Sequence, residues 1–299
     1  MNAVGRREFL KTGTAVLGAT LLTEAGATAL SKDAGAAHAA EPEYEIYAAK
    51  YGGPLFRKVA IVLWNVGWDE DGPISYYVWA LKAKSGEIVL VDTGPSPAQG
   101  AARKVPGFVD PIEVVARIGA NADSVTRVIV THMHWDHVGN IEGYWRAFPK
   151  AKFYVQKREF DFCVKDPISL RKPVVAVFDP EASRAMGGLE KSERLVIVDG
   201  DVQIAPGLDL FLAPGHTLGL QVVRVNTAKG PVVVGSDCAH VFRGYREDNP
   251  SVFIMDMPAW IRSFDKVKAL APIDLIFPGH DILMEQNYPK VAEGVARLV

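Results

Sequence analysis

Residues 131–137 read Thr131-His132-Met133-His134-Trp135-Asp136-His137. Three imidazoles and one carboxylate therefore fall within six consecutive residues. The apolar run Val128-Ile129-Val130 comes directly before them and is typical of a buried strand. A loop that starts at a rigid strand can aim several side chains at one point, whereas a helix would spread them around its axis. Because zinc and similar divalent metals prefer imidazole and carboxylate ligands, the stretch predicts a metal site at a strand end.

The other histidines fit the same interpretation. The chain has seven histidines, of which three lie in this stretch and one, His38, lies in a leader segment. The remaining three each follow or flank a short apolar run, and they are His216, His240 and His280. No histidine is left for an ordinary surface or core position, which favours a shared metal-binding role over a solvated histidine-rich loop.

The pattern resembles that of metallo-β-lactamase superfamily hydrolases. That family's HxHxDH motif is matched by His132, His134, Asp136 and His137, and its later ligands are matched by His216, Asp237 and His280. The run Val89-Leu90-Val91-Asp92-Thr93-Gly94 is similar to the strand-ending Asp-Thr-Gly that the family carries upstream of this motif. The resemblance extends over about residues 59–290. The sequence Pro214-Gly215-His216-Thr217 and its distance from Asp237 are most similar to the dinuclear N-acyl homoserine lactonase branch.

The resemblance implies two metal ions that share one carboxylate. It implies one ion held by His132, His134 and His216, a second held by Asp136, His137 and His280, and Asp237 bridging both together with a hydroxide. Zinc is expected, with manganese, cobalt and iron as alternatives, because the donors are all nitrogen and oxygen. Two adjacent cations lower the pKa of a shared water from about 15.7 toward neutrality. The aspartate at position 237 argues against a true β-lactamase, whose branch usually lacks it.

The expected reaction is hydrolysis of an electrophilic centre, and we favour a lactone ring, such as that of an N-acyl homoserine lactone. The candidate catalytic side chains are Asp136 and His240. His240 stands three residues after Asp237, where the lactonase branch usually carries a tyrosine. An imidazole there could hydrogen-bond the carbonyl, protonate the leaving alkoxide or orient a ligand. Phosphotriester, phosphodiester, sulfate-ester and aryl-ester hydrolysis stay open as alternatives, and so does a non-hydrolytic role.

Two parts of the chain are expected to face the substrate. Aromatic side chains in the leading third could hold an acyl chain, namely Phe56, Trp64, Trp68, Tyr76 and Tyr77. The stretch between His137 and His216 is longer than is usual in the lactonase branch. Within it, residues 160–186 are expected to cap the site.

Composition narrows the range of partners. A hydrophobic content of 48% and a charged content of 23% are ordinary for a soluble globule. A formal net charge of −2 lacks the basic excess that a nucleic-acid backbone demands, which argues against a nucleic-acid partner. The resemblance implies a small-molecule lactone or ester as the partner. Cys163 and Cys238 are expected to be separate buried thiols rather than one disulfide. Since side chains alternate along a strand, Cys238 should point away from the metals.

Residues 1–39 are expected to be a twin-arginine signal peptide. The sequence Gly5-Arg6-Arg7-Glu8-Phe9-Leu10-Lys11 resembles the twin-arginine export signal, and the uncharged residues 12–23 follow it. Ala37-His38-Ala39 is a small-x-small cleavage site. The twin-arginine export machinery is then a partner of the precursor, and the mature protein is expected to be periplasmic or secreted. No later apolar run reaches about 18 residues, so stable membrane insertion is not expected.

Residues 40–299 are expected to form one catalytic domain. The sequence predicts strands at 59–64, 75–81, 87–91, 125–131, 152–156, 195–198, 208–213, 221–226, 232–237 and 275–277. It predicts helices at 112–118, 140–148, 258–270 and 288–298. Strands in two batches, each followed by helices, predict an α/β fold with two sheets packed face to face and helices outside. This four-layer αβ/βα sandwich is the metallo-β-lactamase fold that the resemblance implies, with the metals at one edge of the sheets.

Overall fold

The computed structural model describes residues 43–299 of the chain. The predicted twin-arginine signal at residues 1–39 lies outside these described residues and stays a prediction. Within the described range, no helix is both long enough and apolar enough to span a membrane.

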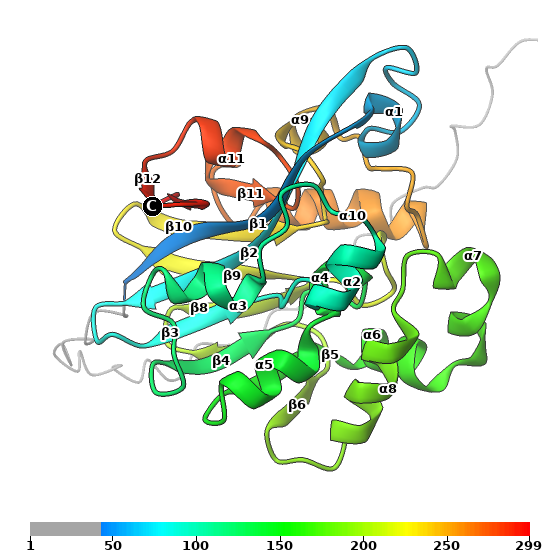
Figure 1. The fold of residues 1–299 in the computed structure, drawn as a ribbon. Helices are drawn as coiled ribbons and strands as arrows, with labels where there is room; N and C mark the ends of the chain where they lie inside the picture. The colour runs from blue at the N-terminus through cyan, green and yellow to red at the C-terminus, as the bar shows by residue number, and fades with distance from the viewer. Residues whose placement is uncertain (1–42) are drawn as a thin grey trace, which may run out of the picture. The chain divides into compact units, whose positions relative to one another are not determined.

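Two β-sheets form the centre of the described structure (Figure 1). The larger has eight strands in the order β12-β13-β1-β2-β3-β4-β5-β6, and the smaller has five in the order β11-β10-β9-β8-β7. The strands of the larger sheet are β1 (Tyr44–Lys58), β2 (Asp71–Ala83), β3 (Ile88–Val91), β4 (Val125–Ile129), β5 (Lys152–Gln156), β6 (Leu195–Val198), β12 (Lys290–Ala292) and β13 (Val295–Arg297). Those of the smaller sheet are β7 (Val202–Ala205), β8 (Leu208–Leu212), β9 (Gln221–Thr227), β10 (Gly230–Ser236) and β11 (Ile276–Pro278).

Helices lie outside both sheets. They are α1 (Val59–Val62), α2 (Pro97–Ala102), α3 (Pro111–Ala116), α4 (Trp135–Val138), α5 (Ile141–Ala147), α6 (Lys157–Phe160), the π-helical turn η1 (Asp161–Lys165), the 3₁₀ turn η2 (Pro167–Leu170), α7 (Lys172–Val175), α8 (Pro180–Leu189), α9 (Phe242–Glu247), α10 (Met257–Lys268), the 3₁₀ turn η3 (Ile273–Leu275) and α11 (Leu283–Gln286).

Three apolar clusters hold these layers together. Trp79 of β2 and Phe277 of β11 belong to a buried cluster between the two sheets. Val128 of β4 and Tyr144 of α5 belong to a second cluster, between the larger sheet and its helices. Trp260 of α10 lies in a third, against the smaller sheet. Full burial of one such large apolar side chain is worth about 1.5–3 kcal/mol. The predicted four-layer αβ/βα sandwich is confirmed.

Strand direction decides where the functional loops lie. β3, β4 and β5 run parallel, so their carboxyl ends share one rim of the larger sheet. In the smaller sheet β10 and β11 run parallel, and β8 points the same way because both β8 and β10 pair antiparallel with β9. The segments that follow β4, β8, β10 and β11 carry the seven predicted metal ligands. Two of these ligands, Asp136 and His137, lie in the short helix α4 rather than in the predicted loop.

Two predicted elements were wrong. Residues 59–64 were expected to be a strand, but Val59–Val62 forms the helix α1, of which only Ala60 and Val62 are buried. A short apolar run does not distinguish a strand from a helix. Residues 288–298 were expected to be a helix, but they form the strands β12 and β13, and β13 pairs with β1.

The sequence interpretation also missed β1 itself, the longest strand described. Its middle contains Gly52-Gly53-Pro54, which is typical of a turn. The strand absorbs this interruption through register shifts against β2 between Lys50 and Leu55. Long pairing on both sides of the irregularity therefore overrides the local turn signal.

Both cysteines are free and buried. Cys238 packs in the apolar cluster beneath α10, and its sulfur is not among the groups that could hold a metal in the described residues. The expectation of separate thiols, with Cys238 directed away from the metal ligands, is confirmed.

Candidate metal centre

A first group of donors forms where the loops after β4, β8 and β10 meet. Nε2 of His132 lies 3.1 Å from Nδ1 of His134, and Nδ1 of His134 lies 3.0 Å from Nε2 of His216. Asp237 brings its Oδ2 to 3.3 Å from Nε2 of His216. All four side chains are buried. Three ring nitrogens and one carboxylate oxygen, drawn from both sheets, therefore converge on one point.

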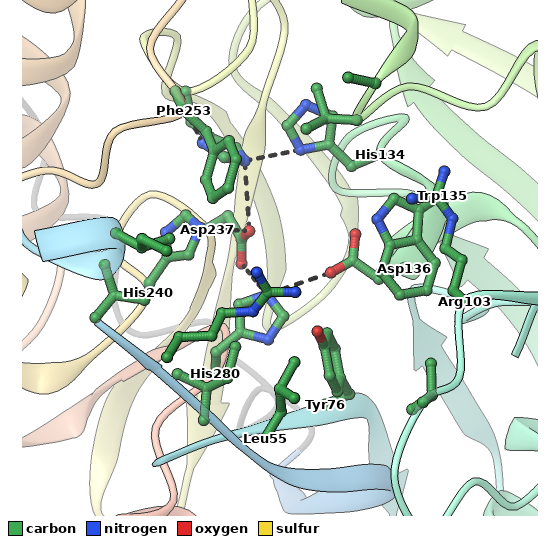
Figure 2. A pocket seen from close by; sticks show the side chains of 18 of the residues that line it. Leu55, Tyr76, Arg103, His134, Trp135, Asp136, Asp237, His240, Phe253 and His280 are labelled. Atoms are coloured by element: carbon green, nitrogen blue, oxygen red, sulfur yellow. Dashed lines mark hydrogen bonds and ion pairs between the residues drawn. The ribbon is translucent and has the colours of Figure 1, made fainter. Parts of the chain in front are cut away.

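A second group lies on the other side of Asp237 (Figure 2). Oδ2 of Asp136 lies 3.9 Å from Nε2 of His137 and 3.7 Å from Nε2 of His280. Oδ1 of Asp237 lies 3.5 Å from Nε2 of His137 and 3.2 Å from Nε2 of His280. Asp237 thus presents one oxygen to each group, and the structure brings all seven predicted ligands together.

Glycine at position 279 permits this close approach of β11 to Asp237. A Cβ atom at residue 279 would lie 1.9 Å from Oδ1 of Asp237, a distance at which two heavy atoms overlap. Any larger residue would push His280 away from the shared carboxylate. Glycine at position 279 is therefore a steric requirement of the site.

The rings of His216 and His280 are oriented by hydrogen bonds from Nδ1, the nitrogen that faces away from the donor group. Nδ1 of His280 donates to the carbonyl oxygen of Ser75 at 3.0 Å, and Nδ1 of His216 donates to that of Phe253 at 2.9 Å. A ring whose Nδ1 carries the proton leaves Nε2 bare, and a bare Nε2 is the form that binds a metal. The tautomer and the ring orientation are therefore set by the protein fold.

Asp92 orients the ring of His137 in the same way. It accepts a hydrogen bond of 2.7 Å from Nδ1 of His137 on one oxygen, and that oxygen also accepts from Oγ1 of Thr131 at 2.8 Å. Its other oxygen accepts from the backbone N–H of Thr131 at 2.7 Å. Asp92 sits at φ 66°, a left-handed conformation that costs a non-glycine residue about 1–3 kcal/mol. The Asp-Thr-Gly that ends β3 thus has a defined role in orienting a ligand.

Glu159, in α6, ties two ligand loops to each other. Its fully buried carboxylate accepts from the backbone N–H of Met133 at 2.8 Å and from that of Gly219 at 2.9 Å. Met133 separates the ligands His132 and His134, and Gly219 follows His216 closely. A Cβ atom at Gly219 would lie 2.2 Å from the backbone nitrogen of Glu159, so the loop needs glycine here. We call this contact the Glu159 clamp.

The electrostatics of the donors fit bound cations. Burial, and then the neighbouring imidazoles, hold the pKa of His132 and His134 well below the usual range, so both rings stay neutral. Burial alone would lower the pKa of His137, but the carboxylates of Asp237, Asp136 and Asp92 outweigh it and raise the pKa well above the usual value. A cation is favoured beside those carboxylates.

Buried polar atoms without hydrogen-bond partners also indicate a site for cations. Nε2 of His137 and Oδ1 of Asp237 have no hydrogen-bond partner among the described residues. Buried polar atoms are costly unless something satisfies them. Together with the donor chemistry, which is all imidazole and carboxylate, this fits two divalent metal ions that share Asp237.

His240 lies beside the same carboxylate. Its Nε2 is 3.4 Å from Oδ2 of Asp237, and its ring stacks on Phe253 with a centroid separation of 5.9 Å. Asp237, His240 and His280 also form a third group that could hold a metal. Burial lowers the pKa of His240 well below its usual value. The geometry therefore allows His240 to face either a metal or a substrate.

A cavity of about 520 Å³ opens over these groups. Its floor contains the accessible metal ligands, and Tyr76 and Trp135 form part of its wall (Figure 2). We call the outer part the mouth, formed by Leu55, Arg57, Arg103, Lys104, Ala176 and Val177. The last two residues lie in the segment expected to cap the site, at residues 160–186, which therefore does reach the cavity.

The expected aromatic wall is largely wrong. Among the aromatic side chains named for it, Tyr76 lines the cavity, whereas Tyr77 is buried elsewhere and the other three do not line it. Phe56, Trp64 and Trp68 are 66%, 47% and 61% exposed. These three residues are close in sequence to Tyr76, but they do not line the cavity, because β1 and β2 extend beyond the rim of the sheet at this end (Figure 1).

A profile described as the metallo-beta-lactamase superfamily matches residues 68–280, which is more than half of the chain. The chain belongs to the metallo-β-lactamase superfamily. The matched range begins before β2 and ends at the ligand His280, so it contains all seven donors.

Known superfamily members are similar to the chain at low identity. An N-acyl homoserine lactonase from a Bacillus species is 24% identical over 179 residues, which cover 59% of this chain. The chain spans 64% of that relative's length. A solved Bacillus thuringiensis AiiA variant with N-decanoyl-L-homoserine at its active site aligns with a TM-score of 0.67 at 20% identity, over 84% of this chain and 98% of its own. AidC, a dizinc quorum-quenching lactonase, aligns with a TM-score of 0.62 at 19% identity, over 81% and 91%.

Superfamily motifs in the sequence did not reveal every functional candidate. The clamp residue Glu159 and the mouth residues Arg57, Arg103 and Lys104 were missed. An acidic residue directly after the buried strand β5 was the available signal for Glu159. No comparable signal exists for the mouth, because its residues come from three separate segments.

Proposed function

We propose that the protein is a dinuclear metal-dependent hydrolase that opens a lactone ring, with N-acyl homoserine lactones as the first substrate class to test. One observation carries the proposal. Asp237 presents Oδ2 to the histidines of one group and Oδ1 to those of the other, at the bottom of a cavity that can admit a small molecule. Such a shared carboxylate suits a pair of divalent ions.

His132, His134 and His216 would hold one ion, Asp136, His137 and His280 the other, and Asp237 both. Zinc is the proposed metal because imidazole-rich nitrogen and oxygen sets suit it, and manganese, cobalt and iron are alternatives. When bound, the two ions would supply an activated water and a Lewis acid that polarises the scissile carbonyl.

The protein's own contribution is to orient the substrate. Asp136 and His240 are the proposed catalytic side chains, and both line the cavity. Nδ1 of His240 is buried and has no hydrogen-bond partner among the described residues. Its proposed role is to hydrogen-bond the substrate carbonyl or the leaving alkoxide oxygen. Val177 and Phe253 add apolar surface around these groups.

The comparisons support a lactone over other substrates. The Bacillus relative and AiiA are N-acyl homoserine lactonases, and the solved AiiA variant holds N-decanoyl-L-homoserine at its active site. AidC is a dizinc lactonase solved with a product, N-hexanoyl-L-homoserine. Phosphotriester, phosphodiester, sulfate-ester and aryl-ester hydrolysis could use the same donors, so the test must include them.

The test is an assay of purified protein against acyl homoserine lactones, simple lactones, aryl esters, phosphotriesters, phosphodiesters, sulfate esters and cephalosporins. We expect lactones to give the highest kcat/KM, and we expect chelation to abolish activity and added zinc to restore it. Elemental analysis should find about two metals per chain, as a dinuclear site requires. A chelated, metal-free protein that retains full activity would overturn the proposal.

We further propose that the precursor is exported by the twin-arginine route to the periplasm or the medium. The support is sequence alone, namely Arg6-Arg7 followed by an uncharged apolar stretch. Replacing both arginines by lysine should leave the precursor in the cytoplasm, as measured by fractionation. Processing near Ala39 and export of that variant would contradict the proposal.

A further inference from the structure

Three cationic side chains surround the mouth of the cavity. Arg57 lies near the end of β1, and Arg103 and Lys104 directly follow α2. All three are exposed, and none forms an ion pair with another residue in the described range 43–299. The chain as a whole carries a formal charge of −2, so this concentration of positive charge does not reflect a general basic excess.

Both arginines line the cavity together with the aromatic residues beside the metal ligands. The guanidinium of Arg103 lies 4.4 Å from the ring centroid of Trp135, which stands between the ligands His134 and Asp136 (Figure 2). Arg57 lines the same cavity as Tyr76, whose ring centroid is 5.2 Å from that of His280. The two guanidinium groups thus stand beside the ligands, above the floor.

The rest of the mouth has no acid to balance these charges. Asp136 and Asp237 are the carboxylates that line the cavity among the described residues, and both are committed to the metal centre. The remaining lining is largely apolar and includes Leu55, Val105 and Val177. A neutral acyl chain would fill the apolar part and leave the cations unused. A planar guanidinium matches the two oxygens of a carboxylate or a phosphate.

We propose that the natural substrate carries an anionic oxygen group, a carboxylate or a phosphate, on the part of the molecule away from the scissile bond, and that Arg57 and Arg103 bind this group. Lys104 adds positive charge at the same mouth. This inference rests on the proposed hydrolysis of an ester or lactone. It specifies that the ester or lactone is anionic, because the positive charges at the mouth and the two metal ions would attract a negatively charged substrate.

The test compares substrates that differ only at the end of the acyl chain. N-hexanoyl, N-adipoyl and N-(6-phosphooxyhexanoyl) homoserine lactones have the same chain length and end in a methyl, a carboxylate and a phosphate. With the metal-loaded protein at low ionic strength, we expect one anionic substrate to exceed the neutral one about tenfold in kcat/KM, the scale of a charge-assisted hydrogen bond. The carboxylate and phosphate arms identify which anion is preferred. Equal or better hydrolysis of the neutral substrate overturns the inference.

Variants link the preference to the arginines. In the double variant Arg57→Gln/Arg103→Gln, the ratio of anionic to neutral kcat/KM should fall toward one, whereas Arg57→Lys/Arg103→Lys should keep much of it. Arg262→Gln, an exposed arginine of α10 outside the cavity lining, is the matched control and should keep the ratio. Added salt should lower the ratio in the native chain, because it screens exposed charges. A ratio unchanged in the glutamine double variant overturns the inference.

Product binding separates this inference from the proposed function. Calorimetry on the metal-loaded protein would compare N-adipoyl-homoserine with N-hexanoyl-homoserine, in native and glutamine-variant chains. If no lactone or ester is hydrolysed but the adipoyl product binds more tightly in an arginine-dependent way, the proposed function fails and anion recognition stands. If N-hexanoyl homoserine lactone is opened rapidly with no anionic preference, the proposed function stands and this inference fails. If neither product binds and nothing is hydrolysed, both fail.

Discussion

The floor and the mouth of the cavity differ in burial and in the number of interactions that hold their side chains. At the floor, the imidazole ligands are buried, and His137, His216 and His280 are each held from behind by a second hydrogen bond. At the mouth, Arg57 and Arg103 are exposed and have no ion-pair partner in the described chain. The floor fixes which chemistry is feasible, whereas the mouth is free to vary with the substrate. Substitutions at the floor should therefore have much larger effects than substitutions in the wall or at the mouth.

The largest effect is expected from Asp237→Ala at the floor. Both donor groups lose their common oxygen ligand, so metal content should fall from about two ions per chain to one or fewer, and lactone hydrolysis should be lost. Elemental analysis and a lactone assay on the same preparation measure both. Two retained ions together with full activity would show that Asp237 does not bridge the groups.

His240→Ala tests whether a side chain at the edge of the floor binds metal or substrate. If His240 binds a substrate oxygen, metal content should stay at about two and kcat/KM should fall by roughly 10². Parallel elemental analysis and kinetics separate the roles. A loss of metal equal to the loss of activity would assign His240 to the third donor group instead. Unchanged kinetics would remove it from the site.

Glu159→Gln tests the clamp behind the floor. The neutral amide would turn its NH₂ toward a backbone N–H, so one charge-assisted hydrogen bond is lost, at a cost of about 1.5–3 kcal/mol in the free energy of unfolding. We expect zinc affinity to fall about 10–100-fold as the ligand loops lose their tie. Denaturant unfolding and a competitive zinc titration measure these effects.

The control for the clamp is Glu193→Gln, a substitution at an exposed glutamate beyond α8. It should change neither quantity. Equal zinc affinity in Glu159→Gln and the native chain would show that the clamp stabilises the fold without positioning the ligands.

The smallest effect is expected from Trp135→Phe, in the wall between floor and mouth. Phenylalanine keeps an aromatic face beneath Arg103, and an exposed cation–π contact is worth only about 0.5–1 kcal/mol. Metal content should be unchanged, and kcat/KM should fall by less than about fivefold. A loss of metal in this variant would show that Trp135 supports the metal ligands. The wall and the floor would then not be separate regions in function.

The floor could be predicted from the sequence because each ligand stands within a few residues of a strand end. His132, Asp237 and His280 follow short apolar runs that end on one rim. Parallel pairing of β10 and β11 then brings Asp237 and His280 together, and packing of the two sheets brings His132 beside them. Local patterns also predicted the fold class, because two groups of strands, each followed by helices, can bury both sheets in only a few arrangements.

The mouth could not be predicted because no local sequence pattern indicates which residues form it. Arg57 belongs to β1, which the Gly52-Gly53-Pro54 interruption concealed, and Val177 belongs to a connecting segment without strong periodicity. The apolar run Val59–Val62 was assigned the wrong state for a related reason, because four residues are too few to show a period. Where tertiary contacts decide the conformation, the sequence pattern of a single segment is insufficient.

The centre takes ligands from both sheets, and this has a consequence for folding. His134 and His137 follow β4 of the larger sheet, whereas Asp237 and His280 follow β10 and β11 of the smaller one. The complete set of donors therefore exists only after the two halves of the chain have docked. A metal that binds this set draws the docking equilibrium toward the native state, by about 2.7 kcal/mol at a free metal concentration 100 times its dissociation constant. Metal uptake should accordingly be a late event in folding, and its rate should report the joining of the two halves.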